Sequence, residues 1–372
     1  MNIPPPPSSS QTPPLTIGDV SASWLTARLN DCGFAGEVAD FTVRPIGTGM
    51  MGSTYKIAIR TTGSDAEGPA SVVLKIAGEG ELSQKLGRHG YGFAGKPGFF
   101  ASEVMVYRII AARTTVRTPR CYYAWLSDDG DRFVLLLEDI SPARSGDELA
   151  GCTLAEGKLA LANLASLHAA MWGSDEFEAE GPLRRTTPDD ASRFAGYMVK
   201  ATKVFHDAHA DRFPEAFVDV LDAFQPRFER WFLARDRIAA LTHNDYRLDN
   251  VMFTDGDTPQ SIALDWQTFT VSHPGFDLGL FLGGSIPTAL RRAHEDELLH
   301  AYYDRLIELG VKAYSFADCR ADFVNGAFLG VKNSVIGLRS VTMTDRGVKM
   351  FDTTLNRAFA TILDHGSLAM LR

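Results

Sequence analysis

The polar stretch Leu241–Phe253, with the sequence LTHNDYRLDNVMF, separates two apolar segments of the chain. Its central part, HNDYRLDN, has the spacing H-x-D-x-x-x-x-N and contains His243, Asp245 and Asn250. A loop of this kind can offer a carboxylate that accepts a hydroxyl proton and, five residues later, an amide oxygen that binds a hard cation. One such aspartate is more often a turn or cap residue, so the interpretation depends on the rest of the chain.

A second aspartate follows in the run IALDW, residues 262–266, where Asp265 ends an apolar strand. A carboxylate is the type of hard oxygen ligand that Mg²⁺ prefers. A metal-dependent hydrolase with His243, Asp245 and Asp265 as ligands is an alternative. That site needs further histidines at ligand spacing, and the sequence does not supply them.

Three glycines upstream, Gly47, Gly49 and Gly52, have the spacing G-x-G-x-x-G. They lie between two predicted antiparallel strands and do not lead from a strand into a helix, which disfavours a Rossmann site. The position suits a glycine-rich flap whose backbone N–H groups cover phosphates. A glycine-rich hairpin with only a structural role is the alternative.

Lys75 is the one cation in the apolar strand SVVLKIA, residues 71–77, and points away from Val72, Leu74 and Ile76. A buried cation is costly without an anionic partner. A lysine that neutralises phosphates while paired to a helical carboxylate explains the residue, and Glu103 is the first acid of the following helix. The alternative is an edge-strand lysine that reaches solvent.

The order of strands and helices predicts an α+β protein. Residues 41–77 form three short β-rich runs typical of an antiparallel meander, and residues 121–140 add two strands around a D-D-G-D turn. Later segments have helical spacing, and one of them opens with the capping box Thr153 and Glu156. The expected helices cover residues 99–112, 153–173, 189–210, 214–238, 288–309 and 317–340.

The composition excludes several classes of protein. With 372 residues, 45% of them hydrophobic, the chain is long enough for two lobes with their own cores. A net charge of -9 and a pI near 5.5 argue against a nucleic-acid partner. The four cysteines show no C-x-x-C spacing, so neither a zinc site nor a disulfide framework is predicted.

The sequence predicts neither a signal peptide nor a membrane span. Residues 1–16 form a Pro-rich stretch without a signal peptide's basic and apolar regions, and we expect a disordered tail. No apolar run is long enough to cross a bilayer. A cytoplasmic protein without an obligate protein partner is therefore the expectation.

These motifs together resemble the protein-kinase-like small-molecule phosphotransferases, which include aminoglycoside phosphotransferases, choline kinases and an ecdysteroid-kinase-like group. The resemblance covers roughly residues 41–310 and is carried by LTHNDYRLDNVMF, IALDWQ and HPGFDLGLFL. The run from DWQ to LGGS and the later LLHAYYDRLIELG are most similar to the ecdysteroid-kinase-like branch. HND also occurs in choline kinases, so that branch stays open.

The resemblance implies a two-lobe fold, ATP and Mg²⁺. Residues 17–137 would be the nucleotide-binding N-lobe, with a small antiparallel sheet and one helix. Residues 138–140 would be the hinge and residues 141–372 the α-rich C-lobe with the acceptor pocket. Nothing between Asp265 and Asp277 resembles an activation segment, which argues against a protein substrate and favours a small-molecule hydroxyl acceptor.

The roles of single residues also come from the resemblance. Asp245 would be the catalytic base, Asn250 and Asp265 would hold Mg²⁺, and Lys75 with Glu103 would bind the α and β phosphates. The remaining assignments are Gly47, Gly49 and Gly52 over the nucleotide, Glu138 and Ile140 in the hinge, and His243 and Asp277 as supports of the catalytic loop. Lys75 and Glu103 are 28 residues apart, a longer gap than is usual in protein kinases.

The acceptor is expected to be an uncharged, largely apolar alcohol. Residues 281–372 contain 11 Lys and Arg against 10 Asp and Glu, so they offer no acidic surplus to a polycationic sugar. The segment Ala321–Leu338 contains a single acid, Asp322, among many apolar residues. A choline- or aminoglycoside-type kinase is the alternative, and a catalytically silent nucleotide-binding protein is the alternative from a different class.

Overall fold

The computed structural model divides the chain into two compact units. The first contains residues 1–113, 118–142 and 265–268, and the second contains residues 114–117, 143–264 and 269–372. The structure describes residues 12–46, 52–62, 68–78, 80–90, 96–234, 237–340 and 344–371. A sheet in the first unit and many helices in the second confirm the expected α+β class. The domain limits drawn from the sequence stay predictions.

A five-stranded antiparallel sheet, in the order β1-β2-β3-β5-β4, forms the centre of the first unit. Its strands are β1 (Glu37–Pro45), β2 (Gly52–Thr62), β3 (Ser71–Ala77), β4 (Cys121–Leu126) and β5 (Phe133–Glu138). In β3, Val72, Leu74 and Ile76 are buried on one face, and Lys75 points to the other because side chains alternate along a strand.

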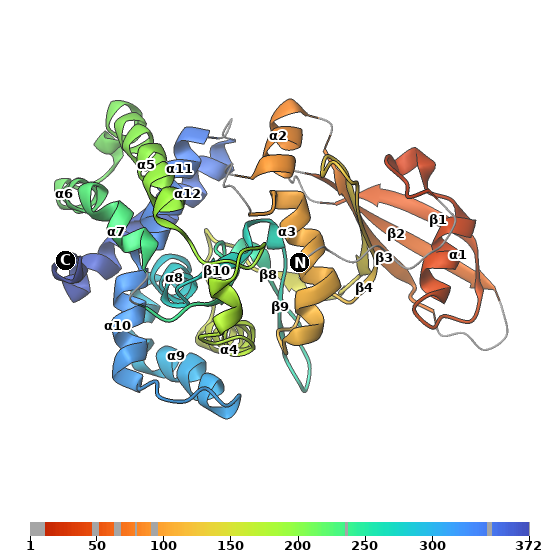
Figure 1. The fold of residues 1–372 in the computed structure, drawn as a ribbon. Helices are drawn as coiled ribbons and strands as arrows, with labels where there is room; N and C mark the ends of the chain where they lie inside the picture. The colour runs from red at the N-terminus through yellow and green to blue at the C-terminus, as the bar shows by residue number, and fades with distance from the viewer. Residues whose placement is uncertain are drawn as a thin grey trace. The chain divides into compact units, whose positions relative to one another are not determined.

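Helices pack on both faces of this sheet (Figure 1). Helix α1 (Ala22–Asn30) buries Trp24, Leu25 and Leu29 in one core with the apolar face of β3. On the other face lies α3 (Phe99–Met105), where Phe100 packs on Phe133 with ring centroids 4.6 Å apart.

Two helices of this unit, α1 and α2 (Glu81–His89), were not expected from the sequence. The expected helix after residue 99 is also shorter, because α3 continues as a π-helical turn at Val106–Ile110 and a 3₁₀ turn at Ala111–Arg113.

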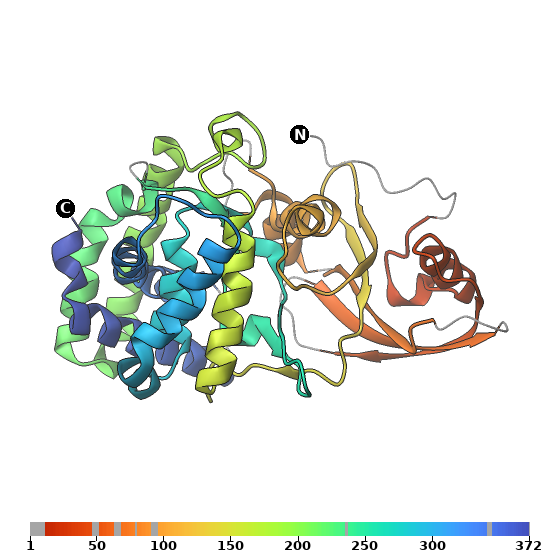
Figure 2. The ribbon, with the colours of Figure 1, turned by 90° about the horizontal axis from the view of Figure 1, so that it is seen from below.

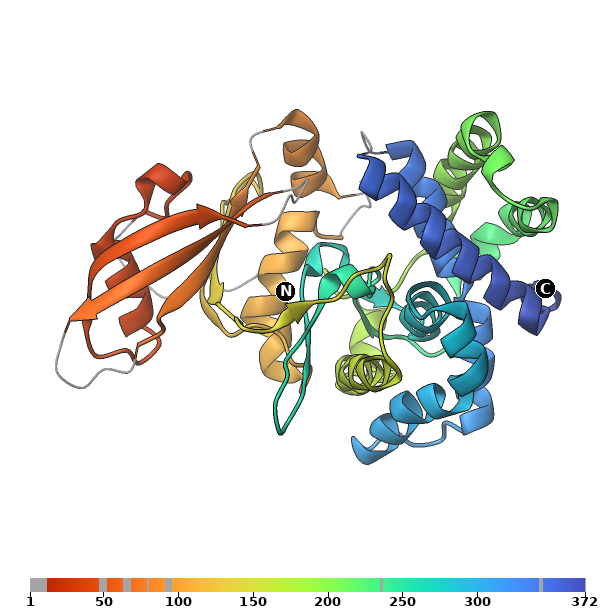
Figure 3. The same cartoon turned by 180° about the vertical axis from the view of Figure 1, so that it is seen from behind.

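The second unit consists mainly of helices. They are α4 (Leu154–Ala169), α5 (Pro188–Ala208), α6 (Glu215–Phe224), α7 (Phe228–Leu233), α8 (Gly275–Leu280), α9 (Thr288–Glu308), α10 (Phe316–Gly326), α11 (Phe328–Ser340) and α12 (Asp345–His365). Helix α4 starts with the predicted capping box, and it lies alongside α9 (Figure 2). Helix α12, dark blue in Figure 3, packs along α11.

Two expected helices are each divided in the structure. The segment 214–238 breaks after α6 into a 3₁₀ turn, Gln225–Arg227, because Pro226 cannot donate the next helical hydrogen bond. The segment 317–340 is divided at Ala327 into α10 and α11. Next to this break, Gly326 lies against the backbone of Gly275, where an added Cβ would overlap the carbonyl oxygen. The missing side chain therefore lets α10 approach α8.

Short strands hold both ends of the polar stretch Leu241–Phe253. Strand β7 (Ala240–Thr242) pairs with β10 (Thr270–Ser272), and β8 (Val251–Phe253) pairs with β6 (Arg144–Ser145) and β9 (Ser261–Ala263). Residues 243–250 are therefore a loop whose two ends are fixed by backbone pairing.

The amino-terminal tail is described only in part. Residues 1–11 lie outside the described residues, while Thr16 forms a capping box with Asp19 at the 3₁₀ turn Ile17–Asp19. Within the described residues, none of the helices combines the length and apolar content required to cross a bilayer.

Candidate active site

Lys75 is the centre of an ion-pair cluster in the first unit. Its Nζ lies 2.7 Å from Glu103 Oε1 and 3.3 Å from Asp265 Oδ1. Gln267 Nε2 donates to the other oxygen of Glu103 at 3.3 Å. Strand β3, helix α3 and the segment after β9 thus each place one charged side chain in the cluster, and the predicted Lys75–Glu103 pair is present despite the long gap.

Burial and charge act against each other in this cluster. Burial disfavours the charged form of Lys75 and lowers its pKa. The Asp265 and Glu103 carboxylates outweigh that effect and raise the pKa of Lys75 to about 12. Burial raises the pKa of Glu103, and Lys75 offsets only part of the increase. Glu103 is 1% exposed, so it depends on Lys75 to remain an anion.

Asp265 has an unusual backbone conformation, with a φ of 60°. Asp and Asn adopt this left-handed region more readily than other non-glycine residues, and residues held there are frequent at functional sites. Trp266, the next residue, is buried and donates its Nε1–H to Thr118 Oγ1 at 3.0 Å. The Asp265 side chain is 43% exposed, so its carboxylate remains accessible.

In the second unit, Asp277 supports the loop 243–250 from helix α8. Its Oδ2 accepts the backbone N–H of His243 at 2.6 Å, and its Oδ1 accepts that of Asn244 at 2.7 Å. His168, in helix α4, contacts Asp277 Oδ2 at 3.3 Å and the Tyr302 hydroxyl at 2.7 Å. These bonds fix the start of the loop, where Asn244 has a φ of 64°.

His243 lies at the base of the same loop and is fully buried. Its Nε2 is 2.8 Å from the carbonyl oxygen of Leu264. A carbonyl only accepts hydrogen bonds, so this nitrogen carries the proton and cannot bind a metal. The other ring nitrogen, Nδ1, is therefore the atom of His243 that the hydrolase alternative needs as a metal ligand.

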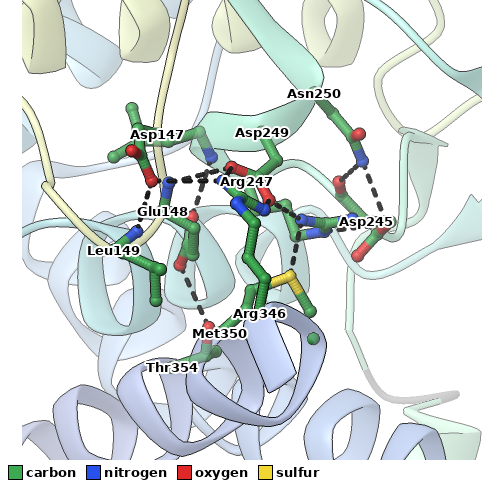
Figure 4. Close-up of polar contacts among 12 residues, drawn as sticks. Asp147, Glu148, Leu149, Asp245, Arg247, Asp249, Asn250, Arg346, Met350 and Thr354 are labelled. Atoms are coloured by element: carbon green, nitrogen blue, oxygen red, sulfur yellow. Dashed lines mark hydrogen bonds and ion pairs between the residues drawn. The ribbon is translucent and has the colours of Figure 1, made fainter. Parts of the chain in front are cut away.

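Asp245 is held on one side of its carboxylate (Figure 4). Asn250 Nδ2 donates to Asp245 Oδ2 at 2.9 Å, and Arg247 Nε donates to the same oxygen at 3.2 Å. Asn250 Nδ2 also donates to the Asp245 carbonyl at 2.9 Å. No described side chain donates to Oδ1, so this oxygen can accept a proton from another molecule.

Charged residues that the sequence analysis missed connect the loop to helix α12 (Figure 4). Arg247 Nη1 donates to Asp249 Oδ2 at 3.0 Å, and Arg346 Nη1 donates to the same oxygen at 3.0 Å. Buried Glu148 accepts the backbone N–H of Leu248 at 3.0 Å. The alternation of charges in RLD indicates pairing, but no sequence signal identifies Arg346, 97 residues away, as the partner.

Lys332, in α11, is another residue that the sequence analysis missed. It lies within the stretch 321–338, which was considered for its apolar residues and its single acid. One cation among apolar residues is the same signal that identified Lys75. The side chain is buried, and the carboxylates of Asp245 and Asp277 attract its charge.

The role of the three predicted nucleotide-binding glycines stays a prediction. Gly47 and Gly49 lie outside the described residues. Gly52 starts β2, and a Cβ added there would lie 2.7 Å from the carbonyl oxygen of Ile76 in β3. Strand packing therefore explains why residue 52 is a glycine, whether or not a phosphate binds there.

The two predicted hinge residues lie at the end of β5. Glu138 is its last residue, and its Oε2 accepts the backbone N–H of Arg120 at 2.9 Å. Ile140 is half-buried and precedes Ser141 and Pro142. Their role in nucleotide binding stays a prediction.

Solved structures of small-molecule kinases share this fold. The choline/ethanolamine kinase family protein from Mesorhizobium loti is 17% identical, with 94% of this chain and 98% of that chain covered and a TM-score of 0.54. Choline kinase from Cryptosporidium parvum Iowa II is 10% identical, with 89% and 92% covered and a TM-score of 0.54. The GDP complex of aminoglycoside 2′-phosphotransferase-IIIa is 14% identical, with 90% and 97% covered and a TM-score of 0.52. At these identities the likeness shows the fold alone.

The sequence itself gives the family. Residues 49–313 match the model of the Ecdysteroid kinase-like family, and the chain belongs to this family. The resemblance drawn from the motifs is thereby confirmed, and the chain is a member of a kinase-like phosphotransferase family, which implies ATP as the phosphate donor. A comparison with curated proteins finds no match.

Proposed function

We propose that this protein is an ATP- and Mg²⁺-dependent phosphotransferase that moves the γ-phosphate of ATP to a hydroxyl of an uncharged, largely apolar small molecule. The observation that carries the proposal is the geometry of Asp245. Two donors hold Oδ2, while no described side chain donates to Oδ1. A carboxylate fixed in this way is oriented to accept a proton from a substrate hydroxyl.

In the proposed reaction the acceptor hydroxyl attacks the γ-phosphorus in line with the bond to the β-phosphate. A new P–O bond to the acceptor forms, the bond to the β-phosphate breaks, and ADP leaves. The hydroxyl proton passes to Asp245 Oδ1. Asp277 keeps the loop in place through the backbone N–H groups of His243 and Asn244.

The donor atoms of Asn250 and Asp265 fit a hard cation. Asn250 donates its Nδ2–H to Asp245, so the amide oxygen Oδ1 of Asn250 is the atom that would bind the cation. The Asp265 carboxylate is accessible. Amide and carboxylate oxygens are ligands that Mg²⁺ accepts. When bound with ATP, Mg²⁺ would offset negative charge on the β- and γ-phosphates.

Lys75 would bind the phosphates while Glu103 holds its ammonium in position. We expect Lys75→Met to lower kcat/KM for ATP at least about tenfold, since a hydrogen bond to a charged group contributes ~1.5–3 kcal/mol. The substitution also leaves Glu103 buried without its cation, so the variant should melt earlier than wild type. Steady-state kinetics and thermal melting check both effects.

The double variant Lys75→Met/Glu103→Gln separates these two effects. Without Lys75, the pKa of Glu103 rises further, and an acid that holds its proton only in the folded state loses stability as pH rises from its unfolded pKa through its folded pKa. Lys75→Met should show this loss on raising the pH, and the double variant should not. Recovered melting temperature with low activity supports a phosphate-binding role. Full activity in either variant would show that Lys75 has no such role.

The apolar acceptor is supported by the charges near α10 and α11. Asp322, the one acid of the stretch 321–338, is already paired: its Oδ1 lies 3.2 Å from Arg237 Nη1, and its Oδ2 accepts the Tyr314 hydroxyl at 2.9 Å. A bound ammonium group needs an anionic or strong acceptor partner. This carboxylate is not available for one.

A substrate panel tests the proposal and its alternatives. ATP consumption would be measured with sterols, other alcohols, sugars, choline and aminoglycosides, and products would be identified by mass. We expect a phosphorylated product from apolar alcohols. Micromolar KM values for aminoglycosides or choline with no product from apolar alcohols would establish the alternative kinase types. Nucleotide binding without any product would favour a catalytically silent protein.

A further inference from the structure

Lys332 is a buried cation that packing alone does not explain. The residue is 2% exposed, and its Nζ lies 5.2 Å from the ring centroid of Phe194 and 5.7 Å from that of Phe232. Among the described residues, none forms a hydrogen bond or ion pair with this ammonium group. Aromatic faces offset only part of the cost of removing a charge from water. Methionine, of similar length, would fit the same position with no such cost.

The charge of Lys332 acts on the loop that carries Asp245. Burial lowers the pKa of Lys332 to about 8, and the carboxylates of Asp245 and Asp277 oppose that decrease by attracting the ammonium. The neighbouring residue Asn333 connects α11 to the loop, because its Nδ2 donates to the carbonyl oxygen of Asn244 at 3.0 Å. Lys332 is thus next in the chain to the residue that links α11 to the loop, and the carboxylates of Asp245 and Asp277 favour its charged form.

A buried positive charge at this place affects some acceptors more than others. An acceptor whose hydroxyl reaches Asp245 brings the rest of its body near the loop and the surrounding helices. A quaternary or primary ammonium there would be repelled by Lys332, because like charges interact strongly where water is excluded. An uncharged alcohol of the same shape experiences no such repulsion.

On the basis of the proposed function, we propose that Lys332 determines acceptor specificity by excluding cationic alcohols from the site of Asp245. Asp245 and Asp277 are two carboxylates that would otherwise attract a cation, and Lys332 neutralises part of their field. The residue takes no part in the phosphate transfer itself. Its role is to make the acceptor site one for uncharged hydroxyl compounds.

A pair of isosteric probes tests this inference without any turnover. Choline carries a trimethylammonium group, and 3,3-dimethylbutan-1-ol carries a tert-butyl group of the same shape on the same hydroxyethyl chain. Their dissociation constants would be measured by ligand-observed NMR at pH 7 in the full chain, for wild type and Lys332→Met. We expect the preference of wild type for the neutral probe to fall at least about tenfold in the variant, mainly through tighter choline binding.

Two controls separate specificity from general damage. Lys200→Met removes an exposed lysine of α5, the helix that carries Phe194, and should leave the preference within about twofold of wild type. The melting temperature of Lys332→Met should equal or exceed that of wild type, because the substitution removes a buried charge that has no ion-pair partner among the described residues. A much lower melting temperature would indicate a structural role and overturn the inference.

The remaining outcomes are equally decisive. An unchanged preference in Lys332→Met, or no binding of 3,3-dimethylbutan-1-ol to either protein, would overturn the inference. Because binding is measured, failure of the transfer reaction is a separate result. A shifted preference without any product keeps the role of Lys332 and removes the proposed reaction. Product formation with an unchanged preference keeps the proposed reaction and removes the role of Lys332.

Discussion

Asp245→Asn is expected to lower turnover at least about a hundredfold, the usual contribution of a positioned general base, with nucleotide affinity nearly unchanged. An asparagine can keep its side-chain oxygen at the place of Oδ2, where Asn250 and Arg247 donate. It cannot take up a proton at the other position. The loop should therefore keep its conformation, and the loss should fall on kcat. Single-turnover kinetics and a nucleotide titration measure the two quantities separately.

Asp249→Asn is the matched control for this prediction. Asp249 lies in the same loop and is held by Arg247 and Arg346, but it has no proposed role in proton transfer. The substitution Asp249→Asn should reduce turnover far less than Asp245→Asn does. Activity of Asp245→Asn within a fewfold of wild type would remove Asp245 from the role of base.

The parts of this protein that the sequence predicted are those with a local cause. Alternation in β3 placed Lys75 opposite Val72 and Leu74, because a strand fixes side-chain direction with a period of two. The pair Thr153 and Glu156 gave the start of α4, since a capping box needs only four consecutive residues. The spacing of the polar loop pointed to the family in the same way.

The parts that it did not predict depend on contacts between distant segments. The division between α10 and α11 lies where Gly326 packs on Gly275, and neither residue predicts the other. Arg346 supports Asp249 across 97 residues. Lys332 is different, because its signal was visible in the sequence: the stretch 321–338 contains one acid, Asp322, and one cation, Lys332, and only the acid entered the prediction.

The Lys75 ion pair and the bonds of Asp245 also differ in how far the sequence predicted them. Lys75 and Glu103 were paired on the assumption that a buried cation needs an anion, and their Nζ–Oε1 distance is 2.7 Å. The bonds that hold Asp245 could not be foreseen, because H-x-D-x-x-x-x-N does not state which oxygen of the aspartate Asn250 contacts. That distinction between Oδ2 and Oδ1 is what the proposed mechanism requires.

Asp265→Asn is expected to weaken the binding of Mg²⁺ with ATP by about a hundredfold, because loss of even an outer-sphere partner of a metal costs about 10–100-fold. Asparagine is the suitable replacement, since it tolerates the left-handed backbone that Asp265 adopts at a φ of 60°. The fold should therefore survive. Saturating Mg²⁺ should restore part of the activity, which it cannot do for Asp245→Asn.

The two variants together test the division of labour between these aspartates. Mg²⁺ titrations of ATP-dependent turnover would be compared for wild type, Asp245→Asn and Asp265→Asn at equal protein concentration. Asp245→Asn should reduce the maximal rate at an unchanged Mg²⁺ midpoint, and Asp265→Asn should shift the midpoint. Indistinguishable titration curves would contradict the proposal that Asp265 holds the metal and Asp245 accepts the proton.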